Sequence, residues 1–379
     1  MPLSLNTAAQ ALKPSGIRRF SNLAARTPGC ISLTLGEPGE ETPANIRAQV
    51  PASLEAGKTH YPPNNGYPAL REAIAHTMGE RGLSYAADEV IVTNGATEAL
   101  YSTLTTLLNP GDEVIIPKPA FLLYDSIVEL CRGTVVSLDT APASYQIDPE
   151  ALAACVSKKT KAIVICSPNN PTGCVLTRQS LDAVARLAAE HDFYVICDDV
   201  YDQLVYQDDY QGFARLHPEL RDRTIVVNSF SKPYAMTGWR LGWLAADAQL
   251  VAQIAKVHQF AVSCVVAFTQ DAAVEALTTD VSAMRESYRA RRDLTLGRLG
   301  EMGLSVVEPE GAFYAFPDVS EFGLSSEEYC ERAITESGVA LVPGVFFGGE
   351  GHVRISYATS EDKLRAGLDR LASFVDSLR

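Results

Sequence analysis

The sequence predicts an α/β fold: a mostly parallel β-sheet sandwiched by helices, with a smaller α+β domain formed by the two chain ends. Three observations support this prediction. Short β-branched runs alternate with helical segments between residues 89 and 246. These runs are nearly continuously apolar, as strands covered on both faces must be. After residue 280 the pattern changes to long charged helices and short strand pairs.

Each element of the predicted sheet can be placed on the chain. The strands are expected at residues 89–93, 113–117, 134–138, 161–166, 193–197 and 224–228. A helix is expected over "TRQSLDAVARLAAEH" (177–191), with Thr177 as its N-cap. This alternation of strands and helices is typical of a parallel sheet with helices on both sides.

The C-terminal part reads as a separate α+β unit. We expect a long helix over 281–303, two strands around a Pro-Glu-Gly turn within 304–319, and a helix opened by a capping box of Ser325 and Glu328. Strands over "VALVPG" and "HVRISYA" and a final helix follow. The prediction is a large domain of residues 43–285 and a small domain formed by residues 1–42 and 286–379.

Composition narrows the class of protein. The 379-residue chain carries a net charge of -14 and no basic run, which argues against nucleic-acid or anionic-membrane partners. The eight scattered cysteines, some inside apolar runs, suit reduced thiols of a cytoplasmic protein better than a disulfide framework. No apolar stretch suits a signal peptide or a membrane span. The six histidines lack metal-ligand spacing, so we expect no metal.

Polar residues follow the ends of several predicted strands, where ligands bind in such sheets. Asp198 ends a buried strand, which is costly unless a cationic or proton-bearing group meets it. Lys232 lies between a strand and bulky apolar residues, in "NSFSKPYAMTGWRLGW" (228–243). Such surroundings lower the pKa of a lysine and make it nucleophilic toward aldehydes. Gly95 opens a helix whose N–H groups suit a phosphate, although such a glycine is more often only a turn. A lysine, a phosphate cradle and an acid are together what pyridoxal phosphate requires.

The sequence resembles the pyridoxal-phosphate-dependent aminotransferases of fold type I, in the subgroup with aspartate, aromatic and kynurenine aminotransferases. The motifs that carry the resemblance lie in order along nearly the whole chain: "LGEP" (35–38), "HYPPNNGYPALREAIA" (60–75), "TNGATEAL" (93–100), "NNPTG" (169–173), "DDVYDQLVY" (198–206), "NSFSKPYAMTGWRLGW" (228–243), "PEGAFYAF" (309–316), "LVPGVFFG" (341–348) and "VRISYA" (353–358). The resemblance implies a ping-pong exchange of an amino group between an L-amino acid and a 2-oxo acid. It also implies a homodimer.

Roles at the cofactor ring follow from the matching positions, as implied by the resemblance. Lys232 matches the lysine that forms the Schiff base and then moves the substrate proton. Asp198 matches the carboxylate that pairs with the pyridinium nitrogen. Tyr201 and Asn170 match groups that hydrogen-bond the ring's phenolate oxygen, and Phe121 falls where an aromatic ring stacks on the pyridine.

The resemblance also implies residues for the phosphate and the substrate. Arg354 matches the arginine that grips the substrate α-carboxylate, with Gly36 and Asn170 beside it. Tyr61 matches a tyrosine that reaches the phosphate bound by the partner subunit. The phosphate cradle itself is expected from Gly95, Ala96, Thr97, Ser229 and Arg240.

Plainer interpretations stay open for some of these residues. Phe121 could belong to the core, Arg354 to the exposed face of an edge strand, and Tyr61 to an ordinary turn. Two positions depart from the common family pattern: Asp199 stands for a glutamate, and Ser167 for an asparagine. We expect little effect from either.

Alternative functions differ in their demands. A β-elimination lyase on the same scaffold would share most motifs, so it is kept as the alternative. A transcription regulator would need a DNA-binding module before the first motif, and that motif begins by residue 35. For dicarboxylate substrates a second cation is required, for which Arg18 or Arg19 is a candidate, although solvated surface charge suits both better. The stretch "KVHQFAVSC" (256–264) points loosely to broad-specificity aspartate, aromatic and diaminopimelate-type enzymes.

Overall fold

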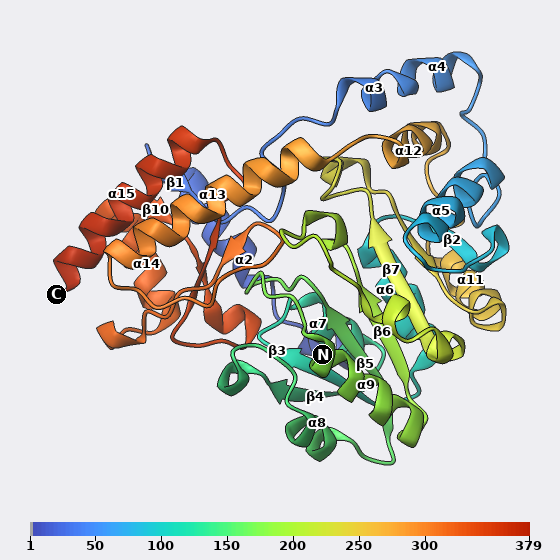
Figure 1. Cartoon of the computed structure of the whole chain (residues 1–379), viewed down its shortest axis with the longest axis horizontal. Coiled ribbons are helices and arrows are strands. Elements are labelled where there is room, and N and C mark those ends of the chain that lie inside the picture. Colours follow the sequence, from blue (N-terminus) through green and yellow to red (C-terminus); the bar gives the residue numbers. More distant parts are fainter. Residues whose placement is uncertain (1–2) are drawn as a thin grey trace.

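A seven-stranded sheet forms the centre of the computed structural model, which describes residues 3–379 (Figure 1). Its strand order is β2-β8-β7-β6-β5-β3-β4, in which β8 runs antiparallel to both neighbours and the other pairs are parallel. The strands are β2 (Val90–Thr93), β3 (Glu113–Lys118), β4 (Thr134–Asp139), β5 (Thr160–Cys166), β6 (Tyr194–Asp198), β7 (Thr224–Ser229) and β8 (Gly242–Ala245). The predicted fold class is confirmed.

Helices cover both faces of this sheet and make up much of the remaining chain. They are α1 (Thr7–Ala11), α2 (Gly16–Arg26), α3 (Ala44–Arg47), α4 (Gln49–Glu55), α5 (Pro68–Glu80), α6 (Ala96–Leu107), α7 (Leu123–Leu130), α8 (Pro149–Cys155), α9 (Arg178–His191), α10 (Phe213–Leu216), α11 (Ala248–Val262), α12 (Gln270–Leu277), α13 (Ser282–Glu301), α14 (Ser326–Ser337) and α15 (Glu361–Leu378). Within residues 3–379 no single helix is long and apolar enough to cross a membrane; α11 and α12 reach that length and composition only together, across a 120° bend.

Alternation along the strands sends side chains into two separate cores. On β5, Val164 packs into a cluster that includes residues of α6, α7 and α11. Its neighbours Ile163 and Ile165 pack into another cluster, with α8 and α9. Because successive side chains of a strand point to opposite faces, a nearly continuous apolar run is buried on both sides.

A smaller part of the structure is built from both chain ends. A three-stranded antiparallel sheet has the order β11-β12-β9, and β1 pairs in parallel with β10. Figure 1 shows α2 and β1, near the N-terminus, beside the C-terminal helices α14 and α15. The strands are β1 (Ile31–Ser32), β9 (Tyr314–Ala315), β10 (Val339–Ala340), β11 (Val342–Pro343) and β12 (Val353–Ser356).

Most predicted elements are present. All six predicted strands form, Thr177 caps α9 through Ser180 N–H, and Ser325 and Glu328 form the capping box of α14. The predicted boundary between residues 285 and 286 falls inside α13, and the two-domain division stays a prediction.

Two predictions about strands were wrong or incomplete. The first half of 304–319 is not a strand: residues 304–310 are irregular, and only Tyr314–Ala315 joins a sheet. Leu304 is buried in the core, so its apolar character reflects packing rather than sheet pairing. Strand β8 was not predicted, because "GWLA" is short and begins with a glycine.

Candidate active site

A cavity of about 240 Å³ lies at the carboxyl ends of β5, β6 and β7. It is completed by the start of α6, by the loop at Gly36 and by β12. Most of the predicted site residues line it: Gly36, Ala96, Thr97, Phe121, Asn170, Asp198, Tyr201, Ser229, Lys232, Arg240 and Arg354. Gly95 lies directly before this lining, at the N-cap of α6, whereas Tyr61 does not line the cavity.

Lys232 lies in the loop that follows β7. Its Nζ donates a hydrogen bond to the carbonyl oxygen of Gly36. Burial, together with the positive charges of Arg354 and Arg240, lowers the pKa of Lys232 to about 8, although Glu37 and Asp198 oppose the shift. A pKa of about 8 leaves roughly a tenth of the amine unprotonated at neutral pH. The lysine is therefore closer to a nucleophile than a surface lysine is.

Asp198 is the last residue of β6 and is buried. Its Oδ2 accepts a hydrogen bond of 2.6 Å from the hydroxyl of Tyr124, whereas its buried Oδ1 has no partner within residues 3–379. Burial raises the pKa of Asp198 to about 6, against the opposing effects of the Tyr124 hydrogen bond, the Val200 backbone N–H and Lys232. A buried, unpaired carboxylate oxygen fits a protonated ring nitrogen, which is what pyridoxal phosphate would present here.

Arg354 is 2% exposed and lies on β12, the central strand of its sheet. Its Nη1 donates to Asn170 Oδ1 at 2.9 Å and its Nη2 to the Thr34 carbonyl at 2.7 Å, while its Nε finds no partner in the described chain. The guanidinium lies 4.5 Å from the ring centre of Tyr314. Among the described residues it forms no ion pair, so a buried cation faces the cavity without a counter-ion. The alternative of an exposed edge-strand arginine is excluded.

The start of α6 forms a cradle with Arg240. Gly95 has φ +77°, a backbone conformation that favours glycine, and a Cβ there would lie 2.6 Å from Arg240 Nη2, so a side chain at this position would displace the guanidinium. Arg240 donates to the Thr237 carbonyl at 2.8 Å and has no carboxylate partner in the part of the chain described. Ser229 places a buried hydroxyl nearby, on the same cavity wall. Free helix N–H groups, a guanidinium and a hydroxyl fit a phosphate.

Phe121 lines the cavity, and its ring packs edge-on against that of Tyr124, with 6.3 Å between the ring centres. The alternative that Phe121 serves only core packing is therefore not favoured. Tyr61, which is predicted to reach the phosphate bound by the partner subunit, precedes α5 in the chain and is 91% exposed. Neither arginine near the N-terminus lines the cavity: Arg19 pairs with Glu327 and Glu331 on α14, and Arg18 is exposed. The single chain therefore gives no support to either as a substrate ligand.

Several residues of the cavity were missed from the sequence. Tyr124 fixes Asp198, and the hydroxyl of Tyr314 lies 2.9 Å from that of Tyr201. Ile17, from α2, adds an apolar wall. Tyr314 lies within the motif "PEGAFYAF", and Tyr124 follows Phe121 by three residues. A tyrosine within a family motif, or a few residues from a predicted site residue, could therefore have indicated these two cavity residues from the sequence.

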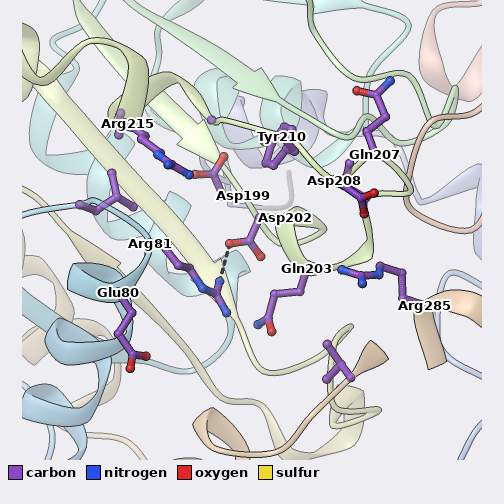
Figure 2. A pocket seen from close by; sticks show the side chains of 15 residues that line it. Glu80, Arg81, Asp199, Asp202, Gln203, Gln207, Asp208, Tyr210, Arg215 and Arg285 are labelled. Atoms are coloured by element: carbon purple, nitrogen blue, oxygen red, sulfur yellow. Dashed lines mark hydrogen bonds and ion pairs between the residues drawn. The ribbon is translucent and has the colours of Figure 1, made fainter. Parts of the chain in front are cut away.

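A second cavity, of about 400 Å³, is lined by residues that include Asp199, Asp202 and Tyr210 (Figure 2). It contains Asp199, one of the two residues that depart from the family pattern, and the ion pair between Arg81 Nη1 and Asp202 Oδ2 at 3.0 Å. Burial raises the pKa of Asp199 well above its usual value. Asp199 lines this second cavity and not the cavity that holds Lys232.

Comparison with known proteins gives consistent results. Residues 28–371 match the family described as aminotransferase class I and II. The chain is 45% identical to a putative aminotransferase, YugH, of Bacillus subtilis and 42% identical to an aspartate aminotransferase of Pyrococcus abyssi, covering 98% and 97% of both chains, respectively.

Solved structures agree with this match. An aspartate aminotransferase from Thermus thermophilus with maleate superposes with a TM-score of 0.94 at 39% identity, covering 98% of this chain and 100% of that one. An aromatic aminotransferase from Pyrococcus horikoshii gives a TM-score of 0.89 at 40% identity, over 94% and 99% of the two chains. These relatives are named for amino transfer and not for β-elimination. The chain belongs to the class I and II aminotransferase family, and it is a pyridoxal-phosphate-dependent aminotransferase.

Proposed function

We propose that this enzyme transfers amino groups with Lys232, Asp198 and Arg354 as its three central groups. One observation carries the proposal. A lysine of lowered pKa, a carboxylate with an unpaired buried oxygen and a buried arginine without a counter-ion among the described residues all face one cavity. Unpaired buried charges are expensive, so their convergence suits a ligand that supplies the missing partners.

Each group has a separate task. When bound, pyridoxal phosphate supplies an aldehyde carbon and an electron-withdrawing ring that stabilises negative charge at the substrate Cα. Asp198 Oδ1 would hold a proton on the ring nitrogen, while Tyr124 keeps the carboxylate oriented through Oδ2. Lys232, as a free amine, would accept the Cα proton of the substrate and return it. Tyr201 and Asn170 are assigned to the ring oxygen.

Binding of the charged ends follows from the two arginines. Arg354 presents a planar guanidinium whose orientation is fixed by Asn170 and the Thr34 carbonyl, so its remaining N–H groups suit the α-carboxylate. Arg240 and the start of α6 would hold the phosphate. Lys232 lines the same cavity as both arginines, and the charges of both act on its amine, so it is available for proton transfer at the substrate Cα.

We further propose a broad, aromatic-accepting substrate range. The cations that line the cavity within residues 3–379 are Lys232, Arg240 and Arg354, and each already has a task. Ile17, Phe121 and Leu123 supply apolar walls. A distal carboxylate would thus need a cation from elsewhere, whereas an aromatic side chain would not.

The test is a panel of amino donors against 2-oxoglutarate and pyruvate. We expect kcat/KM for phenylalanine or tyrosine to equal or exceed that for aspartate. A preference for aspartate by about a hundredfold, the size of one additional charged contact, would contradict the proposed range. Failure of every amino donor would contradict the proposed roles themselves.

The working unit is proposed to be a cytoplasmic homodimer. Tyr61 is 91% exposed and Phe260, on α11, is 88% exposed, while Tyr101, on α6, is 38% exposed. Large exposed apolar side chains of this kind favour contact with a second copy. All eight cysteines are free, which suits a reducing compartment. Sedimentation at enzyme-assay concentrations tests the dimer directly, and an active monomer would refute it.

A further inference from the structure

A buried charge pair lies beside the active site and has no part in the roles assigned so far. Glu98 is on the first turn of α6 and is 8% exposed; His258 is on α11 and is 0% exposed. His258 Nδ1 lies 3.1 Å from Glu98 Oε1 and 3.2 Å from Oε2. We refer to them as the Glu98–His258 pair.

The hydrogen bonds of this pair require a charged histidine. The second ring nitrogen, Nε2, lies 2.8 Å from the carbonyl oxygen of Asn64. Both nitrogens thus face acceptors, and only the imidazolium can donate from both. Burial alone would lower the pKa of His258, but the hydrogen bonds and charge of Glu98 outweigh it and raise that pKa. Glu98 in turn accepts from Ser102 Oγ at 2.5 Å and from Asn94 N at 3.1 Å.

The pair connects two segments that serve different active sites in the proposed dimer. Asn94 directly precedes Gly95, so Glu98 holds the backbone that enters the phosphate cradle. Asn64 belongs to residues 60–66, which carry Tyr61. This Tyr61 segment is also fixed by the hydrogen bond from Val92 N to the Asn65 carbonyl, at 3.1 Å, and by Gly66, whose φ is +94°.

We infer that Glu98 and His258 are positioning residues that lock the Tyr61 segment to the start of α6. One charge pair thereby sets both the phosphate cradle that a subunit owns and the tyrosine that it lends to its partner. The inference rests on the proposed homodimer with shared sites. It assigns to His258 an effect on cofactor binding in the neighbouring subunit, which a residue acting only on its own fold would not have.

Mixed dimers separate the two effects. A subunit with both His258→Asn and Lys232→Ala, paired with a wild-type subunit, leaves one site with a competent lysine, and that site borrows its Tyr61 from the altered subunit. A His258→Asn subunit paired with a Lys232→Ala subunit leaves one competent site whose own cradle is altered but whose borrowed Tyr61 is normal. In each mixed dimer, the concentration of pyridoxal phosphate that gives half-saturation is measured by absorption and by activity. The reference is the mixed dimer of a wild-type subunit with a Lys232→Ala subunit.

We expect both mixed dimers to require about tenfold more pyridoxal phosphate, the effect of losing one charge-assisted hydrogen bond. His258→Gln, whose amide can still reach toward Asn64, should weaken the borrowed-tyrosine dimer less than His258→Asn does. His76→Gln, at an exposed histidine on α5, is the matched control and should change neither. An effect confined to the owned cradle, or no effect in either dimer, would overturn the inference.

A further arm distinguishes this inference from the shared-site proposal. Tyr61→Ala replaces His258→Asn in the subunit that also carries Lys232→Ala, again paired with wild type. If Tyr61→Ala has no effect there, the shared site itself is wrong. If Tyr61→Ala weakens cofactor binding while His258→Asn does not, only the positioning role fails. Circular dichroism of each variant excludes unfolding as the cause of a change.

Discussion

Replacing Tyr124 with phenylalanine is predicted to shift the acid limb of the pH–rate profile upward. The Tyr124 hydroxyl donates to Asp198 Oδ2 at 2.6 Å and opposes the effect of burial, which raises the pKa of Asp198 to about 6. A hydrogen bond to an ionised group contributes about 1.5–3 kcal/mol, and about 1.4 kcal/mol corresponds to a tenfold change in an equilibrium. The limb should therefore move by about one to two pH units.

The direction follows from the state that Asp198 must occupy. The ionised carboxylate is needed to hold the proton on the cofactor ring. In the wild type, the hydrogen bond from Tyr124 stabilises this ionised form, so its loss raises the pKa of Asp198 further. As the pH is lowered, the variant therefore begins to lose activity at a higher pH than the wild type does, while activity on the alkaline plateau changes little. Single-turnover rates of the first half-reaction across the acid and neutral range measure the shift.

Tyr329→Phe is a matched control, because Tyr329 is also buried and its hydroxyl has no partner among residues 3–379. Its acid limb should coincide with that of the wild type. An unchanged limb in Tyr124→Phe would refute the electrostatic coupling between Tyr124 and Asp198. Equal shifts in both variants would show a general packing effect instead.

Three other changes have distinct expected outcomes. Arg354→Lys should raise KM for amino donors by about ten- to a hundredfold, because bidentate binding of the carboxylate is lost, and pyridoxal phosphate binding should be retained. Titrations in which the affinities for the donor and for pyridoxal phosphate fall equally would be inconsistent with the assigned role. Gly95→Ala should weaken pyridoxal phosphate binding about tenfold, because φ +77° is strained for alanine and its Cβ would displace the Arg240 guanidinium, and unchanged binding would argue against the cradle. His258 contributes stability that is fully present below its ordinary pKa of 6.5 and is lost as pH rises through its raised folded-state pKa. The difference in unfolding free energy between wild type and His258→Gln should accordingly shrink as pH rises, and a difference that is constant with pH would contradict the charged state.

The sequence predicted those features of the fold and site that depend on local chemistry. Continuous apolar runs identified the parallel strands, and a lysine or carboxylate at the end of such a strand was conspicuous because it is costly to bury. Lys232 and Asp198 could therefore be predicted as site residues from the sequence alone, and the structure places both in one cavity. Arg354 was predicted only through the family resemblance, since an arginine between two apolar strand residues can also lie on an exposed edge.

What the sequence did not predict depends on contacts between distant segments. Tyr124 reads as a core aromatic of a helix, and only its approach to Asp198 shows a second role. The Glu98–His258 pair joins residues 160 positions apart, and neither residue is unusual in its own helix. Strand β8 also gains its place from its two neighbours rather than from its own apolar length.

Lys232 is proposed as the amine that takes up the cofactor, and borohydride reduction can identify that amine. The enzyme is loaded with pyridoxal phosphate, reduced to make the linkage permanent, digested and analysed by peptide mass spectrometry. We expect the phosphopyridoxyl mass on the peptide that contains Lys232, and its loss in Lys232→Ala. A label on another lysine, with Lys232 unmodified, would refute the assignment of Lys232.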